Sequence, residues 1–267
     1  MPSTGWRSIT EPAGPGGGAP GAAPARAHWL GRVGYLEAAR LQHALAEERK
    51  RGAIPDTFLF LEHPPVITLG RASQEGNLLA PKSVLAARGV EVFETTRGGD
   101  VTYHGPGQLV GYGIVDLRRH GRDVARYLRQ LEQAVIALLA RHGLRGERHP
   151  EYTGVWAEGA KVCAIGVRVD HWVTSHGFAL NVEADLSPFD LIVPCGIRGR
   201  GVTSLARLAP DVAWRVPAVA REAGEELAKV FGWTMDWQDL PGLPTPDPST
   251  AGRTLGGVRR VFPEPGE

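Results

Sequence analysis

The chain has 267 residues, and its 30 Lys and Arg against 29 Asp and Glu give a formal net charge of +1. This balance excludes a surface built around a large positive excess, as nucleic-acid binding requires. With 42% hydrophobic residues the chain can bury a sizeable core, whereas 35 Gly and 21 Pro exceed average usage. A charged partner must therefore be met by a local patch.

The surplus of glycine and proline gathers at the two ends of the chain. Residues 1–28 hold runs of Gly, Ala and Pro with few large side chains, and residues 241–267 are similar. Such segments bury too little apolar surface to offset the entropy of ordering a backbone. We predict a disordered tail over 1–28, one folded domain over 29–240 and a flexible extension over 241–267, in which Val258 and Val261-Phe262 dock weakly.

The sequence also bears on location and redox state. No apolar stretch approaches the ~20 residues that a membrane-spanning helix needs. The first residues lack the apolar segment of a secretory signal and carry only Arg7 and Arg26, so a cytoplasmic location is expected. Cys163 and Cys195 can form at most one bridge, and we expect free thiols.

The first half of the chain is predicted to contain two helices and five short strands. Leu41, Ala44 and Leu45 lie at helical spacing, and His63-Pro64-Pro65 predicts a kinked corner because proline cannot continue a strand ladder. In chain order the elements are a helix over 35–50, strands over 57–62 and 66–69, a helix over 81–88, and strands over 90–95, 101–103 and 109–115.

The second half contains the strongest helical pattern. Beginning at Val124, apolar side chains recur at i, i+3, i+4 and i+7 as one continuous stripe, and Gly143 ends the helix. Three antiparallel strands follow, with turns at Glu158-Gly159 and Asp170-His171. In chain order the elements are a helix over 123–142, strands over 155–156, 161–169 and 172–182, and a helix over 217–231.

Hairpins between the helices, rather than regular strand-helix-strand units, predict the fold class. The expectation is an α/β (α+β) domain in which a mixed, mostly antiparallel sheet is flanked by helices. A doubly wound nucleotide fold is disfavoured. No phosphate-binding glycine motif of either common type is present, so ATP use has no support.

The segment RGGDVTYHGPGQ over 97–108 is the first chemically specialised region. Its glycines and Pro106 surround Arg97, His104 and Gln108, a composition that brings backbone amides and polar side chains close to a ligand. A tight turn followed by a bulged strand would explain the same pattern.

The second such region is 190–205, DLIVPCGIRGRGVTSL. Cys195 lies between Pro194 and Gly196 at the end of an apolar run, where a nucleophilic thiol would protrude from a fixed backbone. An inert core cysteine is the competing interpretation. Cys163 is expected to be structural because it lies mid-strand among apolar residues. Two cysteines without C-x-x-C spacing give no zinc signal, and no metal is expected.

Three residues are candidates to activate Cys195. His104 and His176 lie in glycine-rich, strand-like surroundings and suit a Cys-His pair. Lys161 begins a strongly apolar strand, and a desolvated lysine beside a thiol makes a Cys-Lys dyad chemically sound. Spacing alone leaves this choice open.

Four blocks in order, namely RGGDVTYHGPGQLVGY, KVCAIGVRV, TSHGFALNV and DLSPFDLIVPCGIRGRGVTSL, resemble the signature blocks of the octanoyltransferases of lipoate biosynthesis. The resemblance covers 29–240, which it marks as the catalytic domain. It implies the fold shared with biotin and lipoate protein ligases. It also implies transfer of an octanoyl or lipoyl group from acyl carrier protein to a lysine of lipoyl domains, through an acyl-enzyme thioester.

The resemblance also assigns roles to residues and partners. Cys195 would be the nucleophile and Lys161 the base, with no ATP or other cofactor. The acceptors would be lipoyl domains of 2-oxoacid dehydrogenase E2 subunits and the glycine cleavage H protein, met by a monomer. The implied substrate-binding residues are Arg97, Gly98, Gly99, Asp100, Val101, Thr102, Tyr103, His104, Ala164, Ile165, Gly166, Gly177, Phe178 and Ala179.

Further expectations concern the reaction itself. An apolar slot for the eight-carbon chain would be lined by the backbone of 97–99 with Tyr103, Ile165 and Phe178, and each buried CH₂ contributes about 0.8 kcal/mol. Oxyanion donors would be backbone N–H groups near Cys195 or in the His176-Gly177 turn. Other expectations are a positioning role for His104 and steering of acidic partners by Arg198 and Arg200. The chain departs from the family pattern at Gly113, where Pro is usual, and at Cys163, where Ala is commoner.

Three other functions fit the same residues. A lipoate or biotin protein ligase would activate a free acid with ATP, and a thioesterase would use the same dyad with water as acceptor. A carrier-binding module without catalysis would leave Cys195 structural.

Overall fold

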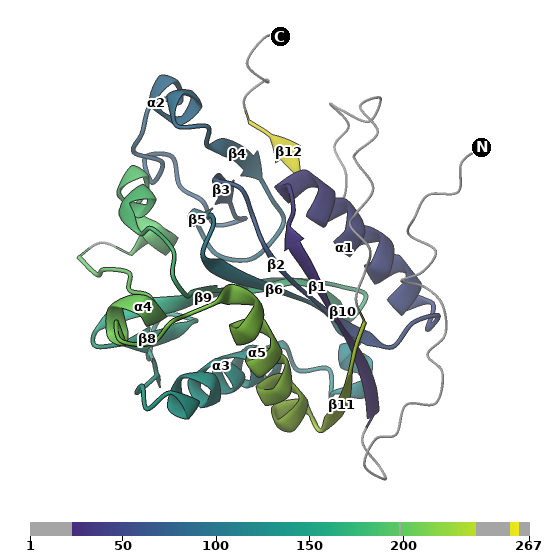
Figure 1. Cartoon of the computed structure of the whole chain (residues 1–267). Coiled ribbons are helices and arrows are strands. Elements are labelled where there is room, and N and C mark those ends of the chain that lie inside the picture. The colour runs from purple at the N-terminus through teal and green to yellow at the C-terminus, as the bar shows by residue number, and fades with distance from the viewer. Residues whose placement is uncertain (1–22, 198, 239–256, 262–267) are drawn as a thin grey trace.

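A computed structural model describes residues 23–197, 199–238 and 257–261 (Figure 1). Within these ranges the framework is an eight-stranded sheet, called sheet A, and a four-stranded sheet, called sheet B. In spatial order sheet A contains β11 (Trp233–Trp237), β1 (Ala23–Arg32), β2 (Asp56–Glu62), β6 (Gln108–Ile114), β10 (Val173–Asn181), β9 (Ala160–Asp170), β8 (Val155–Ala157) and β7 (Glu147–Arg148). Sheet B contains β12 (Arg259–Arg260), β4 (Glu91–Glu94), β3 (Val66–Leu69) and β5 (Thr102–His104).

Both sheets are mixed, and most of their strand pairs are antiparallel. In sheet A only the β1 pairs with β2 and β11 are parallel, and in sheet B only the β3–β4 pair is parallel, within the described residues. The α-helices are α1 (Tyr35–Lys50), α2 (Lys82–Ala87), α3 (Val124–Arg141), α4 (Leu205–Leu208) and α5 (Val216–Phe231). The predicted fold class, a mixed and mostly antiparallel sheet flanked by helices, is confirmed.

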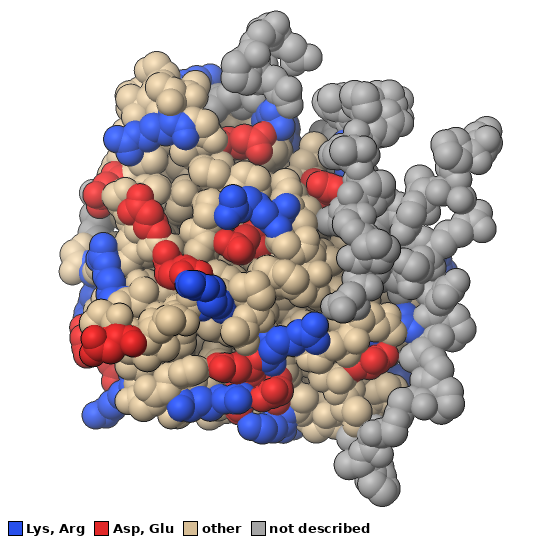
Figure 2. All heavy atoms as spheres, viewed as in Figure 1, with Lys and Arg blue, Asp and Glu red and all other residues tan. Residues whose placement is uncertain are grey.

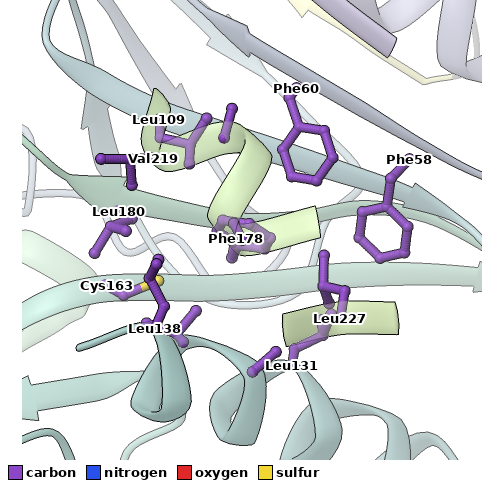
Figure 3. Close-up of a cluster of buried hydrophobic side chains, with 14 of the residues drawn as sticks. Phe58, Phe60, Leu109, Leu131, Leu138, Cys163, Phe178, Leu180, Val219 and Leu227 are labelled. Carbon is purple, nitrogen blue, oxygen red and sulfur yellow. The ribbon is translucent and has the colours of Figure 1, made fainter. Parts of the chain in front are cut away.

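Helices cover both faces of sheet A, and the strands alternate accordingly. On β2, Phe58 and Phe60 belong to the apolar cluster beneath α3 and α5, whereas Leu59 and Leu61 belong to the cluster beneath α1. All four side chains are fully buried. Figure 3 shows the first cluster, in which side chains of β2, β6 and β10 meet Leu131 and Leu138 of α3 and Val219 and Leu227 of α5. A strand buried on both faces reads as a continuous apolar run, which is why TFLFLE is so apolar.

Proline and glycine carry the chain between the two sheets. The predicted corner at His63-Pro64-Pro65 is where the chain leaves β2 of sheet A and enters β3 of sheet B. Residues 105–107 return it from β5 to β6, and Gly107 adopts a φ of +81°. There is no space for a Cβ at Gly107, because one would lie 2.7 Å from the carbonyl carbon of Glu183. These crossings place the segment 97–104, which ends in β5 of sheet B, against sheet A.

Most predicted elements agree with the structure to within one or two residues at each end. The hairpins β8–β9 and β9–β10 are confirmed as antiparallel pairs, with the second turn at His171 and Trp172. The strand predicted at 101–103 is shifted by one residue, because β5 runs Thr102–His104. The pattern predicts neither β11 nor the short β7.

The N-terminal limit of the domain was predicted wrongly. The expected boundary at 28/29 falls inside β1, which begins at Ala23 and pairs with both β2 and β11. Small inward residues, Ala25 and Ala27, hide this strand from a hydrophobicity pattern. At the other end Val258 is buried against Tyr35 and Phe93, as expected for a docking residue. Residues 1–22, 239–256 and 262–267 lie outside the described part.

The surface and the helices also bear on expected partners. On the face shown in Figure 2, Lys and Arg side chains lie among Asp and Glu side chains. This mixed distribution agrees with the net charge of +1. Within the described ranges no helix is both long enough and apolar enough to cross a bilayer.

The core supplies the first testable prediction. Leu138→Ala removes a fully buried side chain between α3 and the sheet. Such truncations lose burial and leave a cavity, so the free energy of unfolding should fall by about 2–5 kcal/mol in urea denaturation. Leu79→Ala, at a side chain 54% exposed, is the matched control and should change it by less than about 0.5 kcal/mol. Equal losses in the two variants would contradict this assignment of the core.

Candidate active site

A cavity of about 380 Å³ lies where the segment between β4 and β5 meets β9 and β10. This volume is within the ~300–1,000 Å³ usual for small-molecule sites. Cys195 and Lys161 both line it, as do His104 and His176. The other lining residues include Tyr35, Arg97, Gly98, Gly99, Asp100, Thr102, Tyr112, Val124, Leu128, Thr153, Ala164, Ile165, Gly166, Val167, Gly177, Phe178, Ala179 and Ile197.

The backbone around Cys195 is tightly constrained. The residue lies in a short 3-10 turn, Pro194–Gly196, with a left-handed φ of 54°. Such a conformation is uncommon for a residue with a Cβ and persists only where its surroundings enforce it. Here the Cys195 N–H donates to the Val101 carbonyl at 2.9 Å. The partly exposed thiol is therefore held at the wall of the cavity, as a nucleophile requires.

Gly196 and Asp100 complete this constraint. Gly196 also has a positive φ, 70°, and a Cβ there would lie 2.5 Å from Asp100 Oδ2. The Asp100 carboxylate accepts hydrogen bonds from Asn77 Nδ2 at 2.5 Å and from the Val101 N–H at 2.6 Å. The Asn77 carbonyl in turn accepts from the Val193 N–H at 2.8 Å. Asp100 and Asn77 therefore support the turn that carries Cys195.

Lys161 is fixed at the start of β9. Its N–H donates to the Gly201 carbonyl and its carbonyl accepts from the Thr203 N–H, both at 3.0 Å. The side chain is 6% exposed. Nζ donates to the Thr153 carbonyl at 3.4 Å and lies 5.1 Å from the centre of the Trp156 ring. The chain segment that follows Cys195 therefore runs directly beside Lys161.

A second, smaller cavity distinguishes Lys161 from the two histidines. It is lined by Cys195, Lys161, Ala164 and Ala179 among others, but by neither His104 nor His176. Only Lys161 of the three candidates lines both cavities with Cys195. This arrangement favours Lys161 as the partner of the thiol.

His104 is held in a buried hydrogen-bonded chain. Its Nδ1 lies 2.7 Å from Gln108 Oε1, and the Gln108 Nε2 donates to the Tyr103 carbonyl and to Asn181 Oδ1. Because the Gln108 oxygen only accepts, Nδ1 must carry the ring proton. Asn181 Nδ2 then donates to the Thr203 carbonyl at 2.9 Å. The His104 ring is thus held in place by hydrogen bonds, as a positioning residue would require.

Two further buried histidines are held uncharged. Burial, together with the positive charges of Arg97 and Arg168, lowers the pKa of His176 to about 3. Burial likewise lowers the pKa of His63 to about 4. His63 bonds to Tyr112 Oη and the Val33 carbonyl, each at 2.7 Å. Both imidazole rings are therefore neutral near pH 7.

Strand alternation corrects part of the predicted substrate-binding set. In the run 101–104, Thr102 and His104 line the larger cavity, whereas Val101 and Tyr103 point to the opposite face and pack in an apolar cluster. The Tyr103 ring contacts Phe189, with centroids 5.6 Å apart. Tyr103 therefore does not line the expected slot. Every other residue of the predicted set lines this cavity.

Glycine allows the 97–100 segment to lie against β9. The Gly98 N–H donates to the Val167 carbonyl at 2.9 Å. A Cβ on Gly166 would lie 2.8 Å from the Gly98 oxygen, so a larger residue would push the two segments apart. Arg97 is 8% exposed and donates to the carbonyl and hydroxyl oxygens of Thr68 at 2.7 and 2.8 Å. The cavity therefore includes a buried guanidinium.

Four of the backbone N–H groups expected as oxyanion donors are already engaged. Cys195 donates to Val101, Gly196 to Val193 and Ile197 to Pro194, at 2.9, 3.0 and 3.0 Å. The His176 N–H donates to Gln42 Oε1 of α1 at 2.7 Å. These four groups are therefore occupied by partners within the protein.

The other residues singled out in the sequence lie in the core, on the cavity wall or at the surface. Cys163 is fully buried in the core, and burial raises the pKa of its thiol, in agreement with a structural role. Ile165 and Phe178 line the cavity and also pack on the core. Arg200 is exposed, whereas Arg198 lies outside the described residues. The family usually has Pro at the position of Gly113. Here the side chains of Tyr127 and Phe58 occupy the space that a Cβ on Gly113 would need.

Asn77 and Asn181 are the supporting residues that sequence reasoning missed. Asn181 ends an apolar run, Phe178 to Leu180, and an isolated polar residue there is the only sequence signal. Asn77 lies in a loop far from Asp100 in sequence and gives no signal at all.

Known proteins resemble this chain over most of its length. Residues 34–228 match the family model "Lipoyl protein ligase A/B catalytic domain". The octanoyltransferase of Rubrobacter xylanophilus is 58% identical over 206 residues, which cover 76% of this chain and 91% of that protein. The octanoyltransferase of Solibacter usitatus is 51% identical over 213 residues, covering 80% and 94%.

Solved structures show the same fold at low identity. A bipartite lipoate protein ligase from Thermoplasma acidophilum superposes with a TM-score of 0.63 at 14% identity, covering 82% of this chain and 88% of that one. A lipoate-protein ligase A bound with ATP gives 0.62 at 15% identity, covering 81% and 88%.

The chain therefore belongs to the family of lipoyl protein ligase A/B catalytic domains, and within it to the octanoyltransferases. It is accordingly an acyltransferase of lipoate biosynthesis.

The buried histidines predict a specific loss of stability in acid. Below the ordinary histidine pKa of about 6.5 the unfolded chain binds protons that folded His176 refuses until about pH 3. The free energy of unfolding should thus decline as pH falls through this window. His176→Asn, which tolerates a left-handed φ, should reduce the slope between pH 6.5 and 4 in urea titrations. An unchanged slope would contradict the assignment.

Proposed function

We propose that this enzyme transfers an octanoyl group from acyl carrier protein to a lysine of lipoyl domains through a thioester on Cys195. The observation that carries the proposal is the shared cavity wall of Cys195 and Lys161. The cysteine is held there in a left-handed turn, and Lys161 is the one candidate base that lines both cavities with it.

In the first step Lys161 Nζ accepts the proton of the Cys195 thiol. The thiolate attacks the thioester carbonyl of the carrier-bound octanoyl group. The phosphopantetheine sulfur leaves and takes the proton back from Lys161, so the acyl-enzyme forms with the base neutral again. Breaking one thioester while forming another needs no ATP, and no metal or other cofactor enters this step.

In the second step the acceptor lysine attacks the Cys195 thioester. Lys161 removes a proton from the attacking amine as the amide forms, and Cys195 Sγ leaves as thiolate. An amide is more stable than a thioester, which drives transfer forward. Arg97 is buried in the same cavity and its charge interacts with that of Cys195, so it can stabilise negative charge on sulfur or on the tetrahedral oxygen.

The cavity also suits the acyl chain. Its wall combines apolar side chains, Ile165, Phe178 and Ala179, with close backbone from Gly98 and Gly99. The acceptors we propose are the lipoyl domains of 2-oxoacid dehydrogenase E2 subunits and the glycine cleavage H protein, met by a cytoplasmic monomer. Commonly acidic carrier and lipoyl domains would be attracted by exposed basic residues near Cys195, such as Arg200.

Covalent capture tests the nucleophile directly. Incubation with octanoyl-carrier protein, without ATP, should raise the intact mass of the enzyme by one octanoyl group. Cys195→Ala should abolish the adduct and the transfer, whereas Cys163→Ala should retain both because Cys163 is buried in the core. An adduct in Cys195→Ala would contradict the assignment. Octanoylation of a lipoyl domain only after ATP is added would indicate a ligase, and release of free octanoate a thioesterase.

The base is tested by single-turnover kinetics. Lys161→Ala should slow acylation of Cys195 by roughly 10²- to 10⁴-fold, the usual contribution of a positioned general base. His104→Gln and His176→Asn, followed in parallel, should lose less because neither ring lines the smaller cavity. Near-normal acylation in Lys161→Ala would transfer the role to one of these histidines.

A further inference from the structure

Glu132 of α3 is a fully buried carboxylate that the proposed reaction does not use. Its Oε2 accepts from Arg129 Nη1 at 2.7 Å and from Arg148 Nε at 3.0 Å. Its Oε1 turns the other way and accepts from the Gly154 N–H at 3.1 Å. One oxygen is therefore held by two arginines at the surface, and the other holds the backbone of the 153–154 segment.

That segment contacts Lys161. The Thr153 carbonyl accepts from Lys161 Nζ at 3.4 Å, and a Cβ on Gly154 would lie 3.5 Å from Lys161 Cε. Gly154 adopts a φ of 128°, and the same Cβ would lie 2.6 Å from the Cys163 carbonyl oxygen. Glycine is required here because the segment approaches β9 this closely.

The arginines fix the carboxylate from the outside. Arg148 on β7 also donates through Nη2 to the Arg129 carbonyl at 3.2 Å and to Gln133 Oε1 at 2.9 Å. Glu132 is thus joined to α3 and β7 at once. Both carboxylate oxygens of Glu132 are hydrogen-bonded, and a buried carboxylate bonded in this way is a rigid anchor for the backbone it binds.

We propose that Glu132 is a positioning residue for Lys161, because its carboxylate fixes the Thr153–Gly154 backbone that holds the lysine side chain at the cavity. The inference rests on the proposed role of Lys161 as base. A lysine side chain has four rotatable bonds, so its amine needs external contacts to stay in place. Thr153 and the Trp156 ring supply these contacts, and Glu132 holds the first of them.

The test compares Glu132→Leu with Glu132→Gln. Leucine removes the acceptor for the Gly154 N–H, whereas glutamine can keep an oxygen there. Glu132 does not line either cavity, so KM for octanoyl-carrier protein should stay within about twofold of wild type. In Glu132→Leu kcat should fall by ten- to roughly a hundredfold, as expected when a catalytic group is misplaced by about 1 Å. Glu132→Gln should recover most of this loss.

Glu226→Leu is the matched control. Glu226 of α5 is also a buried carboxylate with two cationic partners, Arg141 and Lys229, and does not line either cavity. It should lose thermal stability with kcat within about twofold of wild type. If Glu132→Leu and Glu226→Leu lower kcat equally, or if Glu132→Gln is as slow as Glu132→Leu, the inference is wrong.

Gly154→Ala provides a second route if Glu132→Leu does not fold. A Cβ there displaces the same segment while leaving the arginine pairs of Glu132 in place, and it should give the same fall in kcat at unchanged KM. Its combination with Glu132→Leu should be less than additive, because both act through one segment. Wild-type kcat in Gly154→Ala would overturn the inference. Wild-type kcat in Lys161→Ala would instead overturn the proposed role of Lys161 as base, on which this inference rests.

Discussion

The backbone pairing of Lys161 with Gly201 and Thr203 is the contact on which the site depends. It joins the chain after Cys195 to the start of β9, so the proposed nucleophile and the proposed base belong to one hydrogen-bonded unit. Val101 holds the other side of the turn through its bond to the Cys195 N–H. Because buried backbone groups must be paired, neither side can move without leaving donors or acceptors unsatisfied.

Burial of sheet A on both faces excludes water from the polar groups of the site that lie near its strands. With α1 on one face and α3 and α5 on the other, groups near the strands must find partners inside the protein (Figure 1). The chain from His104 through Gln108 and Asn181 to Thr203 meets this requirement and reaches Lys161. Glu132 does the same from the α3 side. The site is therefore rigid because its polar groups have few alternatives.

The sequence predicts a large part of this arrangement, and its failures have clear physical causes. Hydrophobic spacing predicts α1, α3, α5 and the β8–β9–β10 hairpins because each of these elements buries large side chains in a regular pattern. The same pattern does not predict β1 because its inward residues, Ala25 and Ala27, are small. The motif 97–104 is predicted as one binding surface. Its side chains from 101 to 104, however, alternate, so Val101 and Tyr103 pack in an apolar cluster.

The sequence by itself determined the candidates for the catalytic residues. Cys195 between Pro194 and Gly196, Lys161 before an apolar strand and the glycine-rich 97–108 block are all local patterns. Only the tertiary structure distinguishes Lys161 from His104 and His176, because all three line the larger cavity with Cys195 but Lys161 alone of the three also lines the smaller one. Asn77 likewise bonds to Asp100, Asn181 to Thr203 and Glu132 to Gly154, partners that are distant in sequence. Local pattern encodes backbone preference and burial, whereas hydrogen-bond partners are set by how the sheets and helices meet.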